Sequence, residues 1–374
     1  MLIERNQQAP MSDKYPLMAF IANEGVAPKG ERYDRSALVT DTVNKLYKKT
    51  EKGDFIYSSN NLETGSIGLN KYGKACISPV YSIFEPTGIA DSDFLGRRLV
   101  RKDFINAMVK WRQGVIYGQW RIHESDFLKI EISVPSVEEQ RKIGAYLDQL
   151  DHLITLHQRK CALLFSPFQA FISMMFTTST FSWEQRKLGD MMNVTSVKRI
   201  HQSDWTDSGV RFLRARDIVA AAKNEEPDDY LYISKEKYEE YSTLSGKVGV
   251  SDLLVTGVGT IGVPYLVRNL EPLYFKDGNI IWFQNSDKID GKFLFYSFSA
   301  EQIQGFINES AGIGTVGTYT IESGKKTPIS LPNQIEQAKV GEFFQQLDNL
   351  ITLHQRELEK LQNIKKSMLE KMFV

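Results

Sequence analysis

Two segments of this chain, about two hundred residues apart, are almost identical. Residues 149–159 read Gln-Leu-Asp-His-Leu-Ile-Thr-Leu-His-Gln-Arg, and residues 346–356 repeat them with one substitution in eleven positions. Chance does not produce such a match, and the period is far too long for a solenoid repeat of about 20–50 residues. The chain therefore contains an internal duplication of a whole domain followed by a helix.

The duplication extends upstream of these two segments, through short anchors with similar sequences. The matched pairs are residues 132–135 with 329–332, Glu139-Gln140 with Glu336-Gln337, residues 53–58 with 251–256, and residues 65–68 with 259–262. Between the anchors the two halves differ freely. This pattern predicts one scaffold, used twice, that carries two different surfaces.

Composition limits the class of protein. The 374 residues suffice for two ordinary cores. No apolar run approaches the roughly 18 residues that cross a bilayer, and the first residues lack the apolar stretch of a signal peptide, so we expect a cytoplasmic protein. Cys76 and Cys161 stand at non-equivalent places and indicate neither a disulfide framework nor a metal set. A net charge of zero argues against non-specific coating of nucleic acid, but local basic patches remain compatible with reading a DNA sequence.

Each half reads as a mixed α/β (α+β) domain followed by a long helix. Short apolar runs bounded by Gly, Asp or Pro predict strands, and two stretches in the second half have a helical pattern. The expected domains are residues 1–136 and 181–332, and the expected helices are residues 137–180 and 333–374. The predicted strands are residues 54–58, 81–84, 211–214, 252–256, 265–267 and 279–283, and the further helical stretches are residues 235–241 and 293–307.

Both long helices carry an apolar seam with alternating spacings of three and four residues, which predicts an antiparallel coiled coil between them. Pro167 lies inside the first seam, and because proline removes a helical hydrogen bond at a cost of about 3 kcal/mol, we expect the helix to be kinked or broken near it, or simply to end there. The first seam is Leu147, Leu150, Ile154, His157, Cys161, Leu164, Phe168, Phe171 and Met175, and the second is Phe344, Leu347, Ile351, His354, Leu358, Leu361, Lys365, Met368 and Met372.

Several motifs together resemble the specificity subunit of Type I restriction–modification systems. They are Val134-Pro135 followed by residues 138–144 (Glu-Glu-Gln-Arg-Lys-Ile-Gly), Leu331-Pro332 followed by residues 336–341 (Glu-Gln-Ala-Lys-Val-Gly), the two Leu-Asp-x-Leu-Ile-Thr-Leu-His-Gln-Arg stretches, and Trp-Glu-Gln-Arg-Lys-Leu-Gly-Asp at residues 183–190. The match covers essentially the whole chain. In that family each variable domain reads one half of a split DNA target, while the helices space the halves and dock two methyltransferase subunits. Separate motor–nuclease subunits translocate and cut the DNA.

The two halves differ at their starts. In the second domain, residues 183–209 precede the predicted strand at 211–214. The corresponding strand of the first domain is expected at residues 16–20, with only about fifteen residues before it. No Trp-Glu-x-Arg-Lys-Leu-Gly start precedes that strand. The first domain is therefore expected to be truncated at its N-terminus, without one strand or helix of the fold.

Enzyme signatures are absent from the sequence. There is no Walker A motif, and the Gly-x-Gly-x-x-Gly pattern at residues 312–317 precedes a strand-like sequence instead of a helix. The five histidines do not cluster with carboxylates at metal-ligand spacing, so we expect neither a metal nor a cofactor. His157 and His354 occupy equivalent seam positions, which favours hydrogen bonding between the helices.

Residues for DNA contact are sought in the variable loops, where cationic, amide and hydroxyl groups suit base edges and phosphates. Arg214 and Arg216 are expected to alternate along one strand and share a face, and replacement of Arg214 by Ala is expected to alter target recognition. The candidates are Ser58, Ser59, Asn60, Asn61, Arg112, Gln119 and Arg121 in the first domain, and Lys198, Arg199, Arg214, Arg216, Thr256, Thr260 and Tyr319 in the second.

A second apolar stripe remains on each helix after the seam is closed, and such a stripe indicates another packed element. Its residues are Tyr146, Leu153 and Leu156 on the first helix, and Phe343, Leu350 and Leu353 on the second. The resemblance to specificity subunits thus implies a non-catalytic DNA-recognition subunit whose partners are double-stranded DNA, methyltransferase subunits and motor–nuclease subunits. The alternative is a truncated or silent specificity cassette that acts only as a coiled-coil scaffold.

Overall fold

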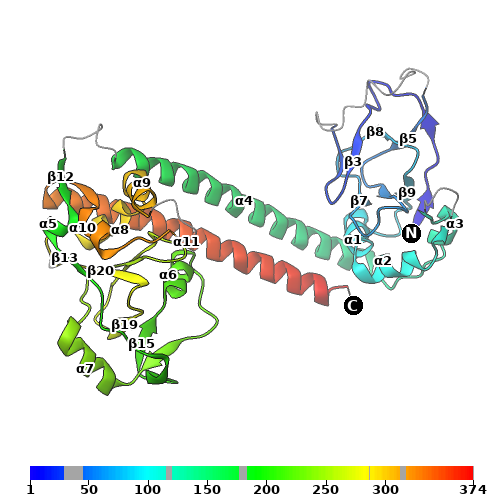
Figure 1. Cartoon of the computed structure of the whole chain (residues 1–374). Coiled ribbons are helices and arrows are strands. Elements are labelled where there is room, and N and C mark those ends of the chain that lie inside the picture. The colour runs from blue at the N-terminus through cyan, green and yellow to red at the C-terminus, as the bar shows by residue number, and fades with distance from the viewer. Residues whose placement is uncertain (29–44, 115–119, 177–182, 286, 312–316, 374) are drawn as a thin grey trace. The chain divides into compact units, whose positions relative to one another are not determined.

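The computed structural model describes residues 1–28, 45–114, 120–176, 183–285, 287–311 and 317–373 (Figure 1). The chain divides into two compact units. Unit 1 comprises Met1–Thr155 with Lys360–Val374, and unit 2 comprises Leu156–Glu359. The division passes through both long helices, α4 (Val137–Met175) and α11 (Gln334–Lys371), so each unit contains one end of each helix.

Unit 1 is built on an antiparallel four-stranded sheet in the order β1-β9-β6-β7, accompanied by a three-stranded sheet in the order β2-β5-β8 and the pairs β3-β4 and β10-β11. Its strands are β1 (Leu2–Glu4), β2 (Gln8–Ala9), β3 (Ala19–Ile21), β4 (Gly25–Ala27), β5 (Tyr47–Thr50), β6 (Phe55–Tyr57), β7 (Ile67–Leu69), β8 (Ala75–Ile77), β9 (Ser82–Pro86), β10 (Gln113–Gly114) and β11 (Trp120–Arg121). Its short helices are α1 (Ser92–Arg98), α2 (Lys102–Val109) and α3 (Glu124–Phe127).

Unit 2 repeats the four-stranded sheet in the order β13-β20-β17-β18, beside a second sheet in the order β14-β16-β15-β19 and the pair β12-β21. Its strands are β12 (Glu184–Lys187), β13 (Asn193–Thr195), β14 (Trp205–Thr206), β15 (Val210–Leu213), β16 (Leu231–Ile233), β17 (Leu253–Thr256), β18 (Pro264–Leu266), β19 (Leu273–Phe275), β20 (Ile280–Gln284) and β21 (Pro328–Leu331). Its helices are α5 (Leu188–Met191), α6 (Ala215–Ala222), α7 (Lys235–Ser245), α8 (Gly291–Ser297), α9 (Glu301–Ser310) and α10 (Ile321–Lys326), with a 3₁₀ turn at Gln202–Asp204.

The central strands are buried on both faces, which explains their uninterrupted apolar sequences. In β6, Phe55 and Tyr57 join one core cluster and Ile56 joins another. In β17, Leu253 and Leu254 divide in the same way between two clusters. The same alternation in both units confirms that one scaffold is used twice.

A parallel contact ties each four-stranded sheet to its neighbour. In unit 2, β15 pairs in parallel with β19, and Phe212 lies opposite Tyr274. In unit 1 the counterpart is a single parallel bridge between Leu17 and Cys76. The sequence comparison had matched residues 16–20 with 211–214, and this shared contact supports that match.

The two scaffolds differ at one edge. In unit 2, β12 pairs with β21 and continues into α5 before β13 begins. In unit 1, β1 takes the place of β13 beside the central strands, and the described residues contain no counterpart of β12 and α5. The sequence predicted the loss of one strand or helix from the first domain, whereas two elements of unit 2 have no counterpart among the described residues of unit 1.

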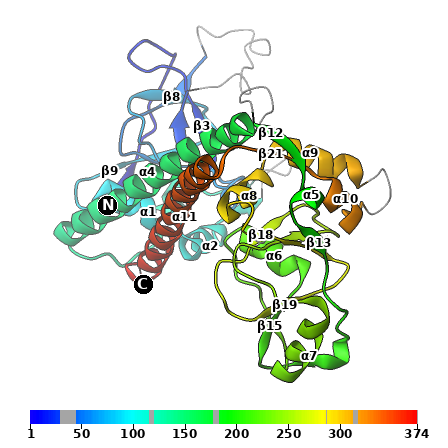
Figure 2. The same ribbon diagram turned by 90° about the vertical axis from the view of Figure 1, so that its left-hand side faces the viewer.

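In both units α4 and α11 pack side by side and antiparallel, as predicted (Figure 2). In unit 1, Asp151 Oδ1 lies 2.5 Å from Lys365 Nζ. In unit 2, the rings of Phe168 and Phe344 lie 5.8 Å apart. No helix among the described residues is long and apolar enough to span a membrane.

The predicted break at Pro167 was wrong, because α4 continues through it to Met175. Pro167 lies on the exposed face of the helix, where water can satisfy the carbonyl that loses its donor. The seam nevertheless changes after it. Phe171 is 44% exposed, whereas Ile172 is only 1% exposed and takes the expected place of Phe171 in the core.

Each long helix begins in a Pro-x₄-Gln motif, at residues 135–140 for α4 and residues 332–337 for α11. The glutamine of this motif has a structural role. Gln140 Oε1 accepts a hydrogen bond from the backbone N of Asp91 (2.9 Å), and Gln140 Nε2 donates to the carbonyl of Pro135 (2.8 Å). Gln337 makes the same two bonds in unit 2, to Asp290 (3.1 Å) and Pro332 (2.8 Å). Each buried glutamine therefore fastens its long helix to the N-terminus of α1 or α8.

One helical prediction needs correction. Residues 293–307 were expected to be helical throughout, but α8 and α9 are separate helices with a turn at residues 298–300. The side chains of Phe298 and Ala300 are buried in that turn, so the apolar pattern continues while the backbone changes direction. A continuous apolar pattern thus concealed the end of a helix.

Candidate nucleic-acid interface

In both units, one end of the four-stranded sheet carries the loop that follows a central strand, β6 in unit 1 and β17 in unit 2. This loop lies beside a later segment of the chain, at Ile122 in unit 1 and at Tyr319 in unit 2. In unit 1 the backbone N of Ile122 donates to Ser59 Oγ (3.0 Å). In unit 2 the backbone N of Tyr319 donates to the carbonyl of Gly257 (2.9 Å). The opposite end of each sheet leads to α1 or α8 and so to the long helices (Figure 1). The loop end is therefore the part of each scaffold that is free to carry a variable surface.

In unit 1 the candidates separate into supporting and exposed residues. Ser58 is buried, and its backbone N donates to the carbonyl of Ser66 (2.8 Å). The guanidinium of Arg112 binds both carboxylate oxygens of Glu63 (2.6 and 2.7 Å), and its Nε donates to the carbonyl of Ser59 (3.0 Å). In the free chain Ser58 and Arg112 therefore support the loop, with their polar groups bound within it, and their predicted contact with DNA stays a prediction.

Three other candidates of unit 1 are exposed at this loop end. Asn60 accepts a hydrogen bond from the backbone N of Trp120 through its side-chain oxygen, which leaves its amide NH₂ directed outward as a donor. Arg121 has 57% of its side chain exposed and lies 3.8 Å from Glu124. Asn61 is exposed as well, whereas Gln119 lies outside the described residues.

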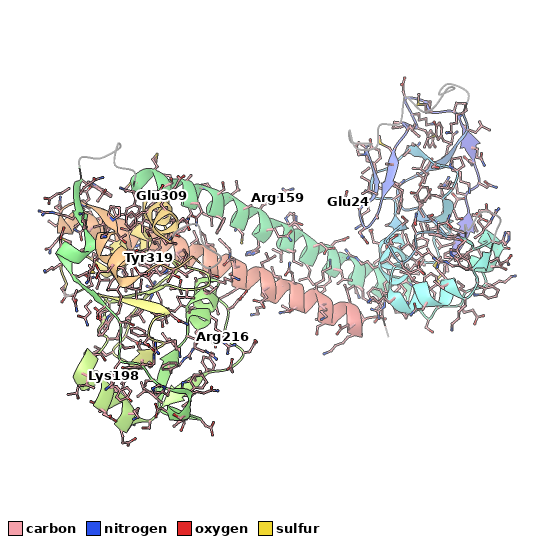
Figure 3. All side chains as sticks on the ribbon, viewed as in Figure 1. Glu24, Arg159, Lys198, Arg216, Glu309 and Tyr319 are labelled. Atoms are coloured by element: carbon pink, nitrogen blue, oxygen red, sulfur yellow. The ribbon has the colours of Figure 1, made fainter. Side chains whose placement is uncertain are left out.

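In unit 2 two predicted contacts prove to be core residues. Tyr319 is 1% exposed, its hydroxyl is hydrogen-bonded to Thr327, and burial raises its pKa (Figure 3). Thr256 is fully buried, and its Oγ1 donates to the carbonyl of Thr260 (2.6 Å) while accepting from the backbone N of Val263 (2.9 Å). Thr256 thereby fixes the loop that carries the exposed Thr260.

The expectation that Arg214 and Arg216 lie on one strand was wrong. β15 ends at Leu213, and Arg214 is the N-cap of α6, where its backbone N donates to the carboxylate of Asp217 (2.8 Å). The Arg214 guanidinium is held between Asp217 and Asp229. Arg216 is exposed and pairs with Asp229 at the surface (Figure 3).

Replacement of Arg214 by Ala is therefore expected to destabilise unit 2 and not primarily to change a base contact. The carboxylate of Asp217 is 1% exposed, and loss of its partner costs about 2–4 kcal/mol. Denaturant unfolding should show this loss for Arg214→Ala and less than about 0.5 kcal/mol for the exposed Arg216→Ala. Equal stability of the two variants would show that Arg214 does not support α6.

Lys198 and Arg199 are exposed just beyond β13, at the same end of the sheet. Arg199 Nε lies 2.8 Å from Asp277, which leaves the two terminal NH₂ groups of the guanidinium for a phosphate. Lys198 Nζ lies 5.1 Å from the ring centre of Tyr241 in α7, and Lys237 Nζ lies over the same ring at 4.7 Å. Sequence reasoning missed Lys237 and Tyr241 because only the fold brings α7 beside residue 198.

One group among the described residues could hold a metal ion. Both His157 Nδ1 and His354 Nδ1 lie 3.3 Å from the same carboxylate oxygen of Glu357, and the donor atoms all lie within 4.8 Å of one another. The sequence spacing concealed this group because its histidines come from different helices. His354 Nδ1 is hydrogen-bonded to Glu357 within α11, whereas His157 Nδ1 has no hydrogen-bond partner among the described residues, so the predicted hydrogen bonding between the helices is not formed.

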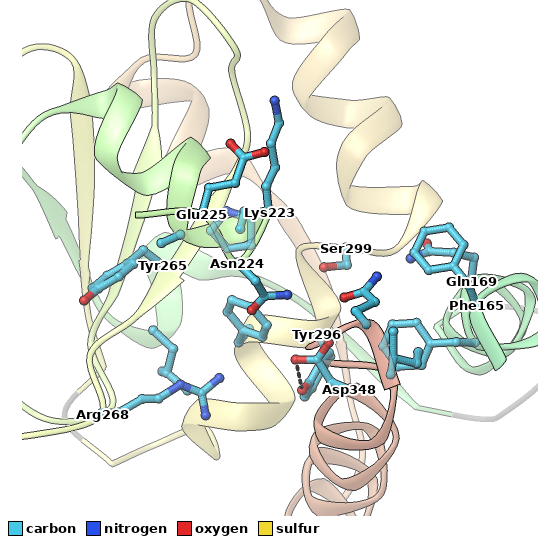
Figure 4. A pocket seen from close by; sticks show the side chains of 18 of the residues that line it. Phe165, Gln169, Lys223, Asn224, Glu225, Tyr265, Arg268, Tyr296, Ser299 and Asp348 are labelled. Atoms are coloured by element: carbon cyan, nitrogen blue, oxygen red, sulfur yellow. Dashed lines mark hydrogen bonds between the residues drawn. The ribbon is translucent and has the colours of Figure 1, made fainter. Parts of the chain in front are cut away.

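A groove of about 780 Å³ in unit 2 lies between the sheet side of the domain and the long helices (Figure 4). Asp348 lies in it, with Tyr296 Oη donating to its carboxylate (3.4 Å), and burial raises the pKa of Asp348 above the ordinary value. At the equivalent position in unit 1, burial also raises the pKa of Asp151, but hydrogen bonds and charges from Lys365 and Arg97 outweigh burial, and the net pKa is lowered.

The two aspartates should therefore affect stability in opposite directions. A lowered pKa means that Asp151 stabilises unit 1 above about pH 4, the unfolded value, and that this contribution disappears as the pH falls through the folded value. A raised pKa means that ionised Asp348 destabilises unit 2 at neutral pH. Thermal unfolding at pH 7 should show Asp151→Asn less stable and Asp348→Asn more stable than the parent chain. The Asp348 difference should vanish below about pH 4, and the Asp151 difference only once the pH has fallen below the lowered folded pKa of Asp151. Shifts of the same sign at pH 7 would contradict this assignment.

The second apolar stripe of the long helices is exposed, as its sequence pattern predicted. Leu153 and its equivalent Leu350 are 40% and 39% exposed, and Tyr146, Leu156, Phe343 and Leu353 are similarly accessible. α4 and α11 thus carry matching apolar stripes at positions related by the duplication. The residues that the sequence predicts to contact a partner helix are therefore accessible in this structure.

Comparison with known proteins was informative. A family model described as the Type I restriction modification DNA specificity domain matches residues 21–164 and again residues 182–363. The MjaVIII Type I restriction enzyme specificity subunit of Methanocaldococcus jannaschii is 24% identical over 373 residues, covering 90% of this chain and 84% of that protein. A putative Type I restriction enzyme specificity subunit of Haemophilus influenzae is 29% identical over 171 residues, covering 44% of this chain and 41% of that protein.

A solved structure shares the fold. The S subunit of a Type I restriction–modification system from M. genitalium aligns with a TM-score of 0.59 at 14% sequence identity, covering 100% of this chain and 96% of that one. The family model matches twice, once on each copy of the duplicated scaffold, and its two matches together cover most of the chain. The chain therefore belongs to the Type I restriction–modification DNA specificity family, as a specificity subunit and not a catalytic one.

Proposed function

We propose that this chain recognises a split DNA sequence within a Type I restriction–modification complex, with the loop end of each unit reading one half. The observation that carries this proposal is the contrast between scaffold and surface. Both units share the sheet order and the hydrogen-bonded corner at Ser59 or Gly257, yet the side chains exposed there differ. One scaffold with two unlike surfaces is what reading two unlike half-sites requires.

The exposed groups suit that task chemically. The amides of Asn60 and Asn61 can pair with adenine edges, and the guanidinium of Arg121 can pair with guanine in the major groove. In unit 2, the hydroxyl of Thr260 suits a base edge or a phosphate, and Lys198 suits a phosphate. Arg199 and Arg216 are paired with carboxylates in the free chain, and their remaining N–H groups suit phosphates. Because each phosphate contact releases counterions, binding should weaken with rising salt concentration.

The apolar stripes support a second part of the proposal, that two methyltransferase subunits dock on the long helices, which also set the separation of the half-sites. The stripes are equivalent under the duplication, so one partner surface fits both. Motor–nuclease subunits join the same complex. The chain itself then needs no catalytic residue.

A second candidate function, a coiled-coil scaffold that does not read DNA productively, is favoured by one observation. Unit 1 has no described counterpart of β12 and α5. If this gap prevents unit 1 from holding its loop end in place, the first half-site is not read.

Base-modification sequencing of cells that carry this chain and a matching methyltransferase, against cells without the chain, distinguishes these functions. A split methylated motif supports reading by both units. A palindromic motif would mean that only one kind of unit reads DNA, and no new methylation would leave only the scaffold function. In the first case, Lys198→Ala with Thr260→Ala should alter one half of the motif, and Asn60→Ala should alter only the other half.

A further inference from the structure

Unit 1 has an open strand edge with an apolar pocket beside it. Within the described residues, the backbone N–H groups of residues 131–134 donate no hydrogen bond, and this segment pairs with no strand. The adjacent pocket has a volume of about 460 Å³. It is lined by Met1, Leu2, Leu95, Leu99, Phe104, Phe127, Leu128 and residues 130–133.

The duplication shows what occupies the equivalent edge in unit 2. There β12 pairs antiparallel with β21, with Arg186 opposite Ile329, and the backbone N of Leu188 donates to the carbonyl of Thr327 (3.0 Å). This pairing covers the edge, because Ile329 is only 1% exposed, whereas its counterpart Ile132 is half-buried. The open edge of unit 1 is therefore a β21 without its β12.

The pocket corresponds to the place of Leu188. Leu188 is fully buried in a cluster that includes Leu294, Phe298 and Ile303. The residues at the same positions of α1, the turn after it and α2 are Leu95, Leu99 and Phe104, and all three line the pocket of unit 1. The walls that enclose Leu188 in unit 2 are thus present in unit 1 around an open space.

A polar contact of the missing segment has a counterpart as well. In unit 2, Trp183 Nε1 donates to Glu336 at the start of α11 (3.3 Å). The equivalent residue at the start of α4 is Glu139, which is exposed. The direction of entry follows from the chain path, because β12 and α5 lead directly into β13, and β13 corresponds to β1 at the N-terminal end of unit 1.

We propose that unit 1 binds an extended segment of the same sequence type as residues 183–191, Trp-Glu-Gln-Arg-Lys-Leu-Gly-Asp-Met, presented on the N-terminal side of Met1. Its strand pairs antiparallel with residues 131–134, and its leucine fills the pocket. This is addition of a strand to an open sheet edge, in which backbone hydrogen bonds provide affinity and the pocket provides selectivity. The proposal does not depend on DNA recognition.

The pairing register gives a sharp test. Hydrogen-bonded and non-bonded pairs alternate along antiparallel strands. Because Leu188 bonds Thr327, the Ile329 position is also a bonded one, and Pro328 stands at a non-bonded one, where proline is tolerated. By equivalence Ile132→Pro should block the edge, whereas Glu131→Pro should leave it competent.

The experiment is hydrogen exchange on the full chain with a synthetic peptide of residues 183–192. Exchange at the amides of Ile132 and Val134 should slow at least about tenfold, with no change at Ile329 and Leu331, whose edge is already covered. A peptide with Asp in place of the leucine and the Ile132→Pro chain should show no slowing, while Glu131→Pro should behave like the parent. Slowing by the Asp peptide, or by the normal peptide on Ile132→Pro, would overturn the proposal.

A covalent version removes the dependence on peptide affinity, since a tether supplies a high effective concentration. Residues 183–191 joined directly before Met1 should raise the unfolding temperature of unit 1, and the same extension with Asp for the leucine should not. No rise with the leucine extension contradicts the proposal. Protection of residues 132 and 134 that grows with protein concentration in the absence of peptide would assign the edge to a second copy instead.

Discussion

Replacement of Gly341 by alanine is expected to destabilise unit 2 by about 3 kcal/mol, near the upper end for an overpacked contact. A Cβ at this position would lie 2.7 Å from Asp290 Oδ1 and 2.8 Å from the backbone N of Phe293. These two atoms form the N-cap hydrogen bond of α8, so they cannot move apart without loss of that cap. α11 would have to shift away from α8, and the bonds of Gln337 would be strained with it.

The duplication provides a matched control at Gly144. There a Cβ would lie 3.4 Å from Asp91 Oδ1 and 3.9 Å from the backbone N of Phe94, which are ordinary contacts. Because alanine favours a helix interior over glycine by about 1 kcal/mol, Gly144→Ala should be neutral or slightly stabilising. Urea unfolding of both variants checks the pair, and a similar loss in both would mean that packing at these positions does not differ as the distances indicate.

The second large effect is expected on assembly. Leu350→Glu with Leu353→Glu places two charges in one apolar stripe and should remove one of two docked methyltransferase subunits from the complex. Burying unpaired charges at a contact costs several kcal/mol, which corresponds to at least about a hundredfold weaker binding. The stoichiometry measured by light scattering should fall from two methyltransferases to one.

The equivalent change on α4, Leu153→Glu with Leu156→Glu, should remove the other methyltransferase, and the four-fold variant should bind neither. The exposed Ala162→Glu on α4 serves as a control, since it adds a charge to the same helix on a face outside the stripe. Full occupancy by two methyltransferases in the four-fold variant would exclude the stripes as docking surfaces.

The sequence predicted the scaffold well because its signals are local or repeated. Continuous apolar runs marked β6, β17 and β20, and the duplicated seams marked the antiparallel helices. The error at Arg214 was avoidable, since Asp217 three residues later is a capping signal for a helix start. The shift from Phe171 to Ile172 depends on how α4 meets the core beyond Pro167, which the seven-residue pattern alone does not encode.

The candidate site was harder to predict. Ser58 and Thr256 follow strands and carry hydroxyls, features typical of exposed loop residues, yet their places in the turn bury them. Tyr319 would have been recognised as a core residue had it been aligned with Ile122, which is fully buried in unit 1. The ion pair that holds Arg112 joins segments separated in sequence, so no local pattern distinguishes this arginine from an exposed one.

Unit 1 is built from two segments at opposite ends of the chain, and this has a consequence for its folding during synthesis on the ribosome. Phe373 packs against Phe94 with ring centres 5.0 Å apart and shares a core cluster with Leu147 and Leu150. The domain that is translated first therefore cannot complete its core until residues 360–374 have been synthesised, which ends roughly 220 residues after Thr155. At about 5–20 residues per second the wait is on the order of 10–40 s. Unit 2 has all its residues sooner, so the domain encoded second can finish folding first, and a nascent chain that stops a dozen residues early leaves its oldest domain unfinished.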